Sequence, residues 1–193
     1  WYCLCAAAGV SLNVQASGFR IPEVSISGLA LSNAMVANPK DIGAFAYNPA
    51  AMSFHEDSSI NMGMMLLRPD MKVRTDSGSH DGDIKDNVFI PKFYGAFRLN
   101  EAWSLGLGVG APFGLESNWD AGTFPALSQP ATAAAHPTKS KLELVAFSPS
   151  VAYRINTNAS ISAGIDYYWA TGLKFNSSGL DVQGDGGDWA WNL

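Results

Sequence analysis

The sequence has 193 residues, enough for one domain with a sizeable core. Charged residues make up only 15% of it, below the usual quarter, and the net charge of -5 argues against a nucleic-acid partner. No apolar run reaches the roughly 20 residues of a transmembrane helix. This composition fits a β-barrel, in which apolar residues occupy alternate positions.

Residues 1–16 are uncharged and either apolar or small, and we interpret them as part of a secretory signal peptide. Val14-Gln15-Ala16 supplies the small residues that a signal peptidase needs before its cleavage point. Cleavage there would make Ser17 the mature N-terminus and would remove Cys3 and Cys5, leaving no disulfide and no Cys-metal site. A buried N-terminal helix is the alternative interpretation.

Residues 17–54 do not alternate, and they contain glycine and proline at irregular intervals. They predict at most short helical turns, for example over residues 29–36. The segment is either an irregular arm of a soluble protein or a hatch that folds inside the lumen of a barrel. Its few charges suit the interior position better than a solvated tail.

From residue 58 onward, apolar residues alternate with polar or small ones, which predicts β-strands with two different faces. The predicted strands cover residues 58–68, 88–99, 103–115, 141–155 and 159–175, and a sixth starts at 189–193. We expect long polar loops at residues 69–86, 116–140 and 176–188, and tight turns at 100–102 and 156–158.

The stretch 103–115 alternates most strictly, and parity assigns each strand an inward and an outward face. Gly106 and Gly108 fall on its inward face, where they permit close approach of another segment. Parity also directs Lys92, Arg98 and Lys174 inward. The outward face of the stretch is continuously apolar and consists of Trp103, Leu105, Leu107, Val109, Ala111, Phe113 and Leu115.

Pro112 and Gly114 interrupt this third strand of the series. Proline has no N–H to donate to the sheet ladder, so the strand is expected to lose a rung and bend there. In a closed barrel, the lost rung would be an opening in the wall at Pro112, Phe113 and Gly114. The alternative is a strand that ends at Gly110.

Two regularities favour an outer-membrane barrel over a soluble β-sandwich. The connections alternate long, short, long, short and long, as do the external loops and periplasmic turns of such barrels. Arg98-Leu99-Asn100 recurs as Arg154-Ile155-Asn156. Trp103 and Tyr153 lie beside the two short turns, where an interfacial aromatic girdle belongs.

Three short motifs carry a family resemblance. They are the arm that begins Ser17-Gly18-Phe19, the stretch Asn48-Pro49-Ala50-Ala51-Met52 seven residues after Asp41, and the strand end Phe113-Gly114-Leu115. With them the sequence resembles the long-chain fatty acid transporter family of Gram-negative outer membranes, which also includes importers of toluene-like hydrocarbons. The resemblance implies an all-β, transmembrane antiparallel barrel of about fourteen strands. Residues 17–54 would be its hatch, and residues 55–193 would be a fragment with the first strands.

The resemblance also implies passive uptake of a hydrophobic molecule, with a hatch shift and lateral exit at the kinked third strand. A long-chain fatty acid is the first candidate substrate and an aromatic hydrocarbon the second. A buried carboxylate would need a cation, and Lys92, Arg98 and Lys174 are the inward candidates. The implied hatch and substrate contacts are Gly18, Phe19, Asn48, Pro49 and Ala50, and the implied exit is Pro112, Phe113 and Gly114.

The sequence indicates neither an enzyme nor a cofactor or metal site, because His55, His80 and His136 are far apart and no Ser/His/acid spacing occurs. The remaining alternatives are an outer-membrane adhesin and a soluble β-sandwich binding protein. Besides the substrate, the expected partners are outer-membrane lipid and lipopolysaccharide, and the protein is expected to be monomeric.

Overall fold

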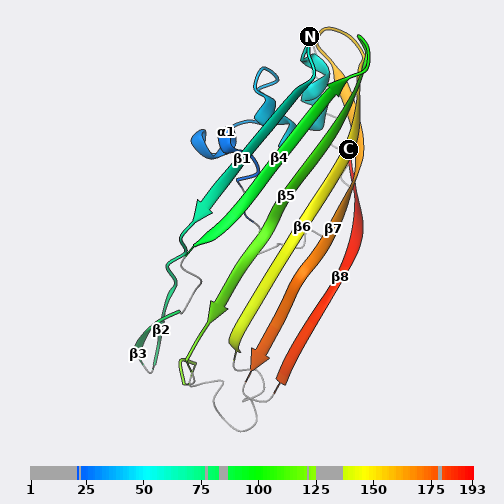
Figure 1. The fold of residues 1–193 in the computed structure, drawn as a ribbon. Coiled ribbons are helices and arrows are strands. Elements are labelled where there is room, and N and C mark those ends of the chain that lie inside the picture. Colours follow the sequence, from blue (N-terminus) through cyan, green and yellow to red (C-terminus); the bar gives the residue numbers. More distant parts are fainter. Residues whose placement is uncertain are drawn as a thin grey trace, which may run out of the picture.

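The computed structural model describes residues 21, 23–76, 78–82, 87–120, 122–124, 137–177 and 180–193. Its main feature is a six-stranded antiparallel sheet in the order β1-β4-β5-β6-β7-β8 (Figure 1). The strands are β1 (Ser59–Leu67), β4 (Val88–Arg98), β5 (Trp103–Asn118), β6 (Pro137–Arg154), β7 (Ser160–Ser177) and β8 (Leu180–Asn192). A separate hairpin pairs β2 (Lys72–Thr75) with β3 (Gly78–Asp81). No helix within the described ranges is long and apolar enough to cross a membrane.

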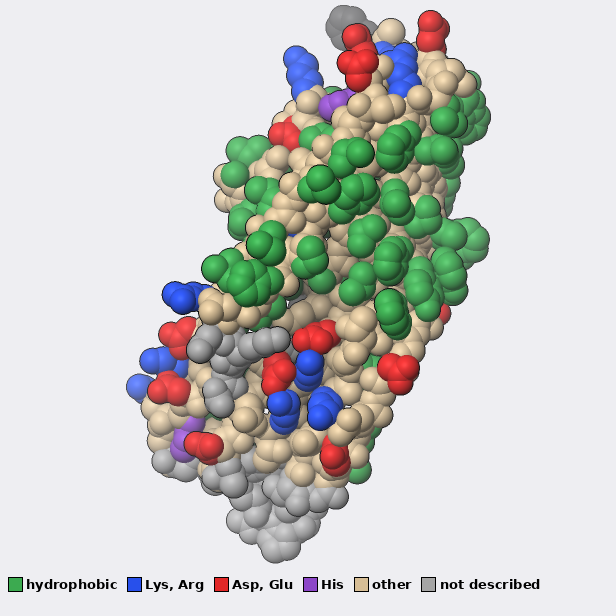
Figure 2. Space-filling model, viewed as in Figure 1, with side chains coloured by type: hydrophobic (Ala, Val, Ile, Leu, Met, Phe, Trp, Pro, Cys, Tyr) green, Lys and Arg blue, Asp and Glu red, His purple; other side chains and the backbone are tan. Residues whose placement is uncertain are grey.

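The two faces of the sheet differ as the alternation predicts. The outer face is apolar and uncovered: Met62 of β1 is 76% exposed, and Trp103 and Leu105 of β5 are 44% and 43% exposed. Figure 2 shows hydrophobic side chains spread over one face of the molecule. On the inner face, Ser104 is 3% exposed and Ala152 is fully buried. The apolar face of the sheet is therefore turned outward, as in a barrel wall that faces lipid.

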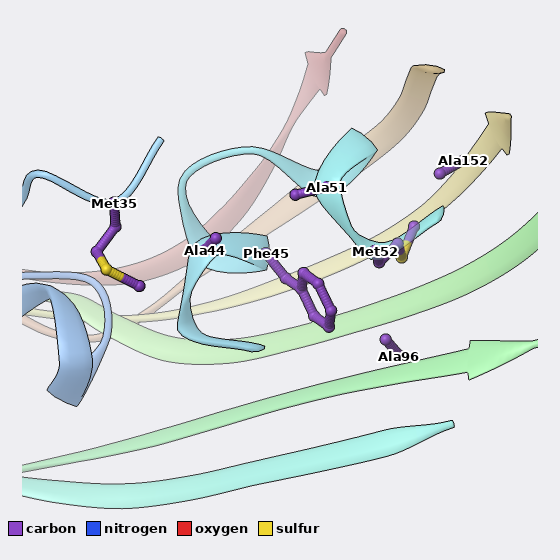
Figure 3. Packing of buried hydrophobic residues seen from close by; sticks show 7 residues of the cluster. All are labelled: Met35, Ala44, Phe45, Ala51, Met52, Ala96 and Ala152. Carbon is purple, nitrogen blue, oxygen red and sulfur yellow. The ribbon is translucent and has the colours of Figure 1, made fainter. Parts of the chain in front are cut away.

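The inner face is covered by the segment before the sheet, residues 21 and 23–54, which we call the hatch segment. It contains α1 (Ile26–Ala30) and two 3-10 helices, η1 (Ile42–Ala46) and η2 (Pro49–Phe54). A buried cluster joins it to the sheet (Figure 3), consisting of Met35, Ala44, Phe45, Ala51 and Met52 from the segment with Ala96 and Ala152 from the strands. The position of this segment inside a closed lumen stays a prediction.

Short polar side chains start each turn of the hatch segment. The side chains of Ser25, Asp41 and Asn48 accept hydrogen bonds from backbone N–H groups at the starts of α1, η1 and η2, at 3.0, 2.7 and 3.2 Å. Such caps satisfy donors that a helix start leaves unpaired. The Asn48-Pro49 motif therefore has a local structural role, because Pro49 also occupies a first-turn position that needs no N–H.

The two short turns explain the internal repeat. Asn100 Oδ1 accepts hydrogen bonds from the N–H groups of Ala102 and Trp103, both at 2.9 Å, and Asn156 Oδ1 accepts one from Asn158 at 2.8 Å. These are side-chain-closed turns of the kind that Asn favours. We call the end of the sheet that holds these two turns the short-turn end, and the opposite end of the strands the loop end.

The three predicted long loops contain more strand than expected. Residues 69–86 include the β2–β3 hairpin, and β5 and β6 extend into 116–140. The polar stretch 176–188 is mostly strand, since β7 ends at Ser177 and β8 begins at Leu180, so the fifth connection is not long. Its glycines and aspartates predicted a loop from local preference, but pairing with β7 overrides that preference.

A β-bulge in β5 and another in β7 reverse the inward and outward positions that simple alternation predicted for the residues after them. The β5–β6 register shifts between Gly110 and Phe113, and the β7–β8 register shifts between Ala170 and Leu173. Each extra residue moves all later side chains of its strand to the other face. Phe113 therefore lies on the inner face, and Lys174, which parity directed inward, lies on the outer face.

We expect Gly106→Leu to destabilise the fold by loosening the hatch segment. A Cβ at Gly106 would lie 2.6 Å from Ser150 Oγ and 2.8 Å from Met52 Sδ, so a leucine must displace Met52. Overpacking of this kind costs about 1–3 kcal/mol. The measurement is the temperature at which the folded, heat-modifiable form disappears from detergent gels.

Gly110→Leu is the matched control, because the nearest atom to a Cβ there is Tyr94 Oη at 3.6 Å. An equal loss of thermal stability in both variants would contradict close packing of the hatch segment at Gly106.

Candidate functional site

The sheet contains a break between its second and third strands. The β4–β5 pairing runs from Arg98 to Lys92, which is paired with Gly110. Beyond that pair, β4 continues to Val88 in register with β1, and β5 continues to Asn118 in register with β6. The two strands therefore separate toward the loop end while each keeps its other neighbour, and the separation starts at the bulge that holds Pro112.

This geometry decides between the two interpretations of Pro112. The strand does not end at Gly110, because β5 is continuous to Asn118. It loses its ladder on the β4 side only, as expected for a proline without an N–H group beside an extra residue. The predicted interruption of the third strand is thus present in the structure as a bulge, and its use as an exit stays a prediction.

The start of the hatch segment docks in this break. The N–H of Ile21 donates a 2.9 Å hydrogen bond to the carbonyl oxygen of Pro112. The Ile21 side chain is 7% exposed and forms a small apolar cluster with Met65 and Ile90 from the strands on the β4 side. Ile21 thus supplies both a backbone hydrogen-bond donor and a buried apolar side chain at the point where β4 and β5 separate.

Two side chains of β4 hold the arm that follows Ile21. Tyr94 Oη donates to the carbonyl oxygen of Val24 at 2.6 Å, and Lys92 Nζ donates to the carbonyl oxygen of Glu23. From the hatch segment itself, Tyr47 Oη accepts from the Val24 N–H at 3.1 Å. These bonds fix the arm against the wall beside the break.

Lys92 is the unusual member of this group. It is only 5% exposed, and within the described part of the chain it forms no ion pair with a carboxylate. A buried ammonium group is costly unless it is paired and hydrogen-bonded. A neutral backbone carbonyl compensates it in part, so the site retains capacity for an anion.

A cavity of about 250 Å³ lies between the hatch segment and the inner wall, and Lys92 lines it. Its floor is the glycine-rich stretch of β5, and Pro112 lies at its edge. Polar groups from β6, β7 and β8 also face it, so it is less apolar than the sequence suggested. Other residues that line it include Tyr94, Pro49, Ser148, Asp166, Tyr168 and Asn192.

A second cavity, of about 400 Å³, lies on the same face nearer the loop end. Four neighbouring strands supply its apolar side chains, which are Phe113, Leu142, Leu173, Phe175 and Val182. Met71 and the polar or charged residues Glu116, Ser117, Ser140, Lys141 and Lys174 also line it. The bulges at Pro112 and Gly172 bring Phe113, Leu173 and Phe175 onto this face. The linings of the two cavities follow each other along β5, where Pro112 belongs to the inner cavity and Phe113 to the second one.

The predicted site residues are only partly brought together. Lys92, Pro49 and Pro112 share the inner cavity, and Phe113 and Gly114 line the second one. Asn48 and Ala50 hold η2 in place instead, and Ser160 Oγ donates to the Ala50 carbonyl at 3.0 Å. Gly18 and Phe19 lie outside the described residues.

Arg98 has a different role from the predicted contact with a carboxylate. Its Nη1 donates to the carbonyl oxygens of His55 and Glu56 at 3.0 and 3.1 Å, at the short-turn end. It therefore ties the exit of the hatch segment to β4, away from both cavities.

The sequence interpretation missed Ile21, Tyr94 and Tyr47 as site residues. Tyr94 could have been found, because it has the same parity as Lys92 and is separated from it by one residue. Ile21 and Tyr47 stand in an irregular segment without a period, and no local pattern predicts their partners. In the described ranges, no group of three His, Cys, Asp or Glu side chains is arranged to hold a metal ion.

Comparison with known proteins supports a transport role for this architecture. A model of the family "Outer membrane protein transport protein (OMPP1/FadL/TodX)" matches residues 7–183. The chain belongs to this family. Its members are transport proteins of the outer membrane, so FadL/TodX membership confirms the predicted family, the all-β class and the predicted location.

Individual relatives are distant. The chain is 27% identical to outer membrane protein P1 of Haemophilus influenzae over 201 residues, covering 92% of this chain and 40% of that protein. It is 25% identical to the long-chain fatty acid transport protein of Escherichia coli K12 over 177 residues, covering 89% and 36%. The chain thus spans about two fifths of the length of these curated relatives.

A solved structure shares the fold. The crystal structure of a Pseudomonas aeruginosa FadL homologue superposes with a TM-score of 0.63, covering 91% of this chain and 48% of that one at 16% sequence identity. At this identity the likeness shows the fold alone.

We expect Tyr94→Phe to loosen the arm without unfolding the sheet. The variant loses the hydrogen bond to the Val24 carbonyl, which is worth about 1 kcal/mol net, so amide exchange in residues 21–25 should accelerate about fivefold. Hydrogen–deuterium exchange with mass spectrometry measures this.

Tyr153→Phe is the matched control, since Tyr153 lies on the outer face, where it packs against Trp103 at a ring distance of 4.7 Å. Unchanged exchange of the arm in Tyr94→Phe would show that this bond does not hold it.

Proposed function

We propose that this chain is part of a passive importer of long-chain fatty acids, which leave the lumen sideways between β4 and β5. The observation that carries the proposal is the break beyond the Lys92–Gly110 pair, filled by Ile21 of a separate segment. A gap in a wall that faces lipid needs backbone partners, because each unpaired group costs several kcal/mol there. Here the partner is a segment that can be displaced.

The two cavities support a path toward that break. The apolar cavity at Phe113 offers burial for an acyl chain at the loop end, and the inner cavity continues from it to Pro112. Burial of each methylene group contributes about 0.8 kcal/mol, so an alkyl chain gains affinity without any polar contact. Movement of the arm would then open the break. No energy source is needed as long as the cell consumes the substrate.

Lys92 supports a carboxylate head group. It lines the inner cavity, its Nζ donates to the Glu23 carbonyl oxygen, and a carboxylate would give it a charge-assisted hydrogen bond. The name of the Escherichia coli relative agrees with this choice. An aromatic hydrocarbon is the second candidate, which the apolar lining of the cavity at Phe113 favours.

We expect Pro112→Val with Gly114→Thr to reduce fatty acid uptake to the background of cells without the protein. Valine restores an N–H to the strand, and threonine at Gly114 has room, since the nearest atom to its Cβ is Val88 Cγ1 at 3.9 Å. The barrel should be no less stable than before. Uptake of labelled oleate by whole cells is the measurement.

Pro149→Val provides the control, because Pro149 pairs with Leu107 in an uninterrupted part of the β5–β6 register. Normal uptake by a well-folded Pro112→Val/Gly114→Thr variant would mean that the substrate leaves another way, most simply down the lumen. Normal uptake of a neutral hydrocarbon together with no uptake of oleate by the unmodified protein would favour the second candidate.

We expect Lys92→Met to weaken oleate binding by about 10-fold to 100-fold, the loss of one hydrogen bond to a charged group. Toluene binding should change little. Tyr94→Phe is the control, since it loosens the same arm but keeps the ammonium group. Equal losses for oleate and toluene in Lys92→Met would assign to Lys92 a purely structural role.

A further inference from the structure

We propose that the outer face of the sheet carries a binding site for the phosphate groups of lipid A at its loop end. The site is a ladder of charged residues that we call the rim ladder, formed by Glu116, Lys139, Lys141, Glu143 and Lys174. Three strands contribute to it, and the strand registers place its side chains on the outer face. Glu116, Lys141 and Lys174 also line the cavity at Phe113.

The bulges place the rim ladder outside. Glu116 is paired with Lys141, and Lys141 with Lys174, in the registers that follow the two shifts. Lys174 is also paired with Gln183 of β8, on the face that holds Trp189 and Trp191. Without the bulge at residues 171–172, Lys174 would face the inner cavities. Figure 2 shows acidic and basic side chains gathered below the hydrophobic area on this face.

The outward residues of β6 show where the rim ladder lies relative to the hydrocarbon layer. On β6, the outward positions from Tyr153 to Val145 are all apolar, and the next outward residues are Glu143 and Lys141. This belt covers the roughly 9–11 residues that a barrel strand needs to cross the hydrocarbon. Lys141 lies four residues beyond Val145, about 13 Å along the strand, which is the depth of lipid head groups.

The side of the membrane follows from the connections. The rim ladder lies at the loop end, and long loops are external in outer-membrane barrels. The lipid of that leaflet is lipopolysaccharide, whose lipid A carries phosphates at the top of its acyl chains. At the short-turn end the arginines turn toward the hatch segment and the residues that follow it: Arg98 donates to the carbonyl oxygens of His55 and Glu56, and Arg154 lies 5.4 Å from the ring of Phe54.

The charges of the rim ladder are incompletely balanced. Glu116 lies 2.6 Å from Lys139 and 4.0 Å from Lys141, and Glu143 lies 3.1 Å from Lys141. Lys174 forms no ion pair among the described residues, although it lies directly across from Lys141. Like charges in that arrangement repel each other unless an anion lies between them. A phosphate placed between Lys141 and Lys174 removes that repulsion.

Gly172 leaves space beside the sheet for two side chains of the rim ladder. A Cβ at this position would lie 3.3 Å from Glu143 Oε2 and 3.4 Å from Lys141 Cε. Its absence lets both side chains lie against the sheet, which leaves their charged ends accessible to a head group beside the wall.

The experiment compares lipid A binding by the whole protein and by variants, in detergent, by native mass spectrometry with bisphosphorylated lipid A as the probe. Lys139→Gln/Lys141→Gln/Lys174→Gln should bind at least about tenfold more weakly, since each basic residue near an anionic surface adds to affinity. Lys72→Gln is the matched control: Lys72 lies in the β2–β3 hairpin, where its side chain is 63% exposed and is 3.5 Å from Asp81. Its affinity should not change.

Glu116→Gln tests the proposal in the opposite direction. It releases Lys139 and Lys141 without removing a positive charge, so lipid A should bind more tightly, and this result stands even where the triple variant does not fold. Dephosphorylated lipid A and phosphatidylethanolamine should not distinguish any of these proteins. Unchanged lipid A affinity in a folded triple variant or in Glu116→Gln, or equal binding of dephosphorylated lipid A, would overturn the proposal.

Discussion

Backbone hydrogen bonding between β4 and β5 is the constraint on which this structure depends. A sheet that faces lipid cannot leave its N–H and C=O groups unpaired, because no water is present to satisfy them. This sheet nevertheless separates beyond Gly110, at the bulge that holds Pro112. The hatch segment resolves the conflict by bringing the Ile21 N–H to the Pro112 carbonyl and by packing the Ile21 side chain against Met65 and Ile90. The same segment is held by Lys92 and Tyr94 from the wall. Closure of the wall and docking of the arm are therefore one interaction, and a ligand that disturbs one must disturb the other.

Most of the sheet could be predicted from the sequence because its two environments differ so strongly. Lipid demands apolar residues on one face, and the hatch segment demands small residues on the other, so strict alternation survives over many positions. The break at Pro112 was also predictable, since proline acts on the backbone regardless of tertiary context. The turns at Asn100 and Asn156 follow from local side-chain bonds, and so do the caps at Asp41 and Asn48.

The features that could not be predicted from the sequence depend on contacts between distant segments. A bulge adds one residue to a strand only relative to its partner, and nothing in residues 110–113 or 170–173 alone says on which side of the sheet the chain resumes. Parity therefore misassigned Phe113 and Lys174. The partners of Ile21 and Tyr47 lie in an aperiodic segment, where pairing is decided by tertiary fit. The first part of β8, residues 180–188, was predicted as a loop because its Gly and Asp residues favour turns locally, while β7 supplies a ladder that outweighs them.

The strand β6 shows why the bulges matter. It crosses the shift in the β5–β6 register without an extra residue of its own, and its sequence reverses polarity there. From Tyr153 to Val145 its outward residues are apolar, and its inward residues, such as Ala152 and Ser150, are small. Beyond that point Glu143 and Lys141 face outward, while Leu144 and Leu142 face inward. The outer face of the wall is therefore apolar where it faces hydrocarbon, and the inner face is apolar where it faces the loop-end cavity.

The neighbouring strands β5 and β7 have apolar residues beyond this point at positions that simple alternation would turn outward. Each of them therefore needs one bulge to keep the same faces as β6. The bulge of β5 carries Pro112, so the reversal of polarity and the break in the wall occur at one place. An apolar molecule in the loop-end cavity therefore lies directly beside the only interruption of the β4–β5 ladder within the described strands.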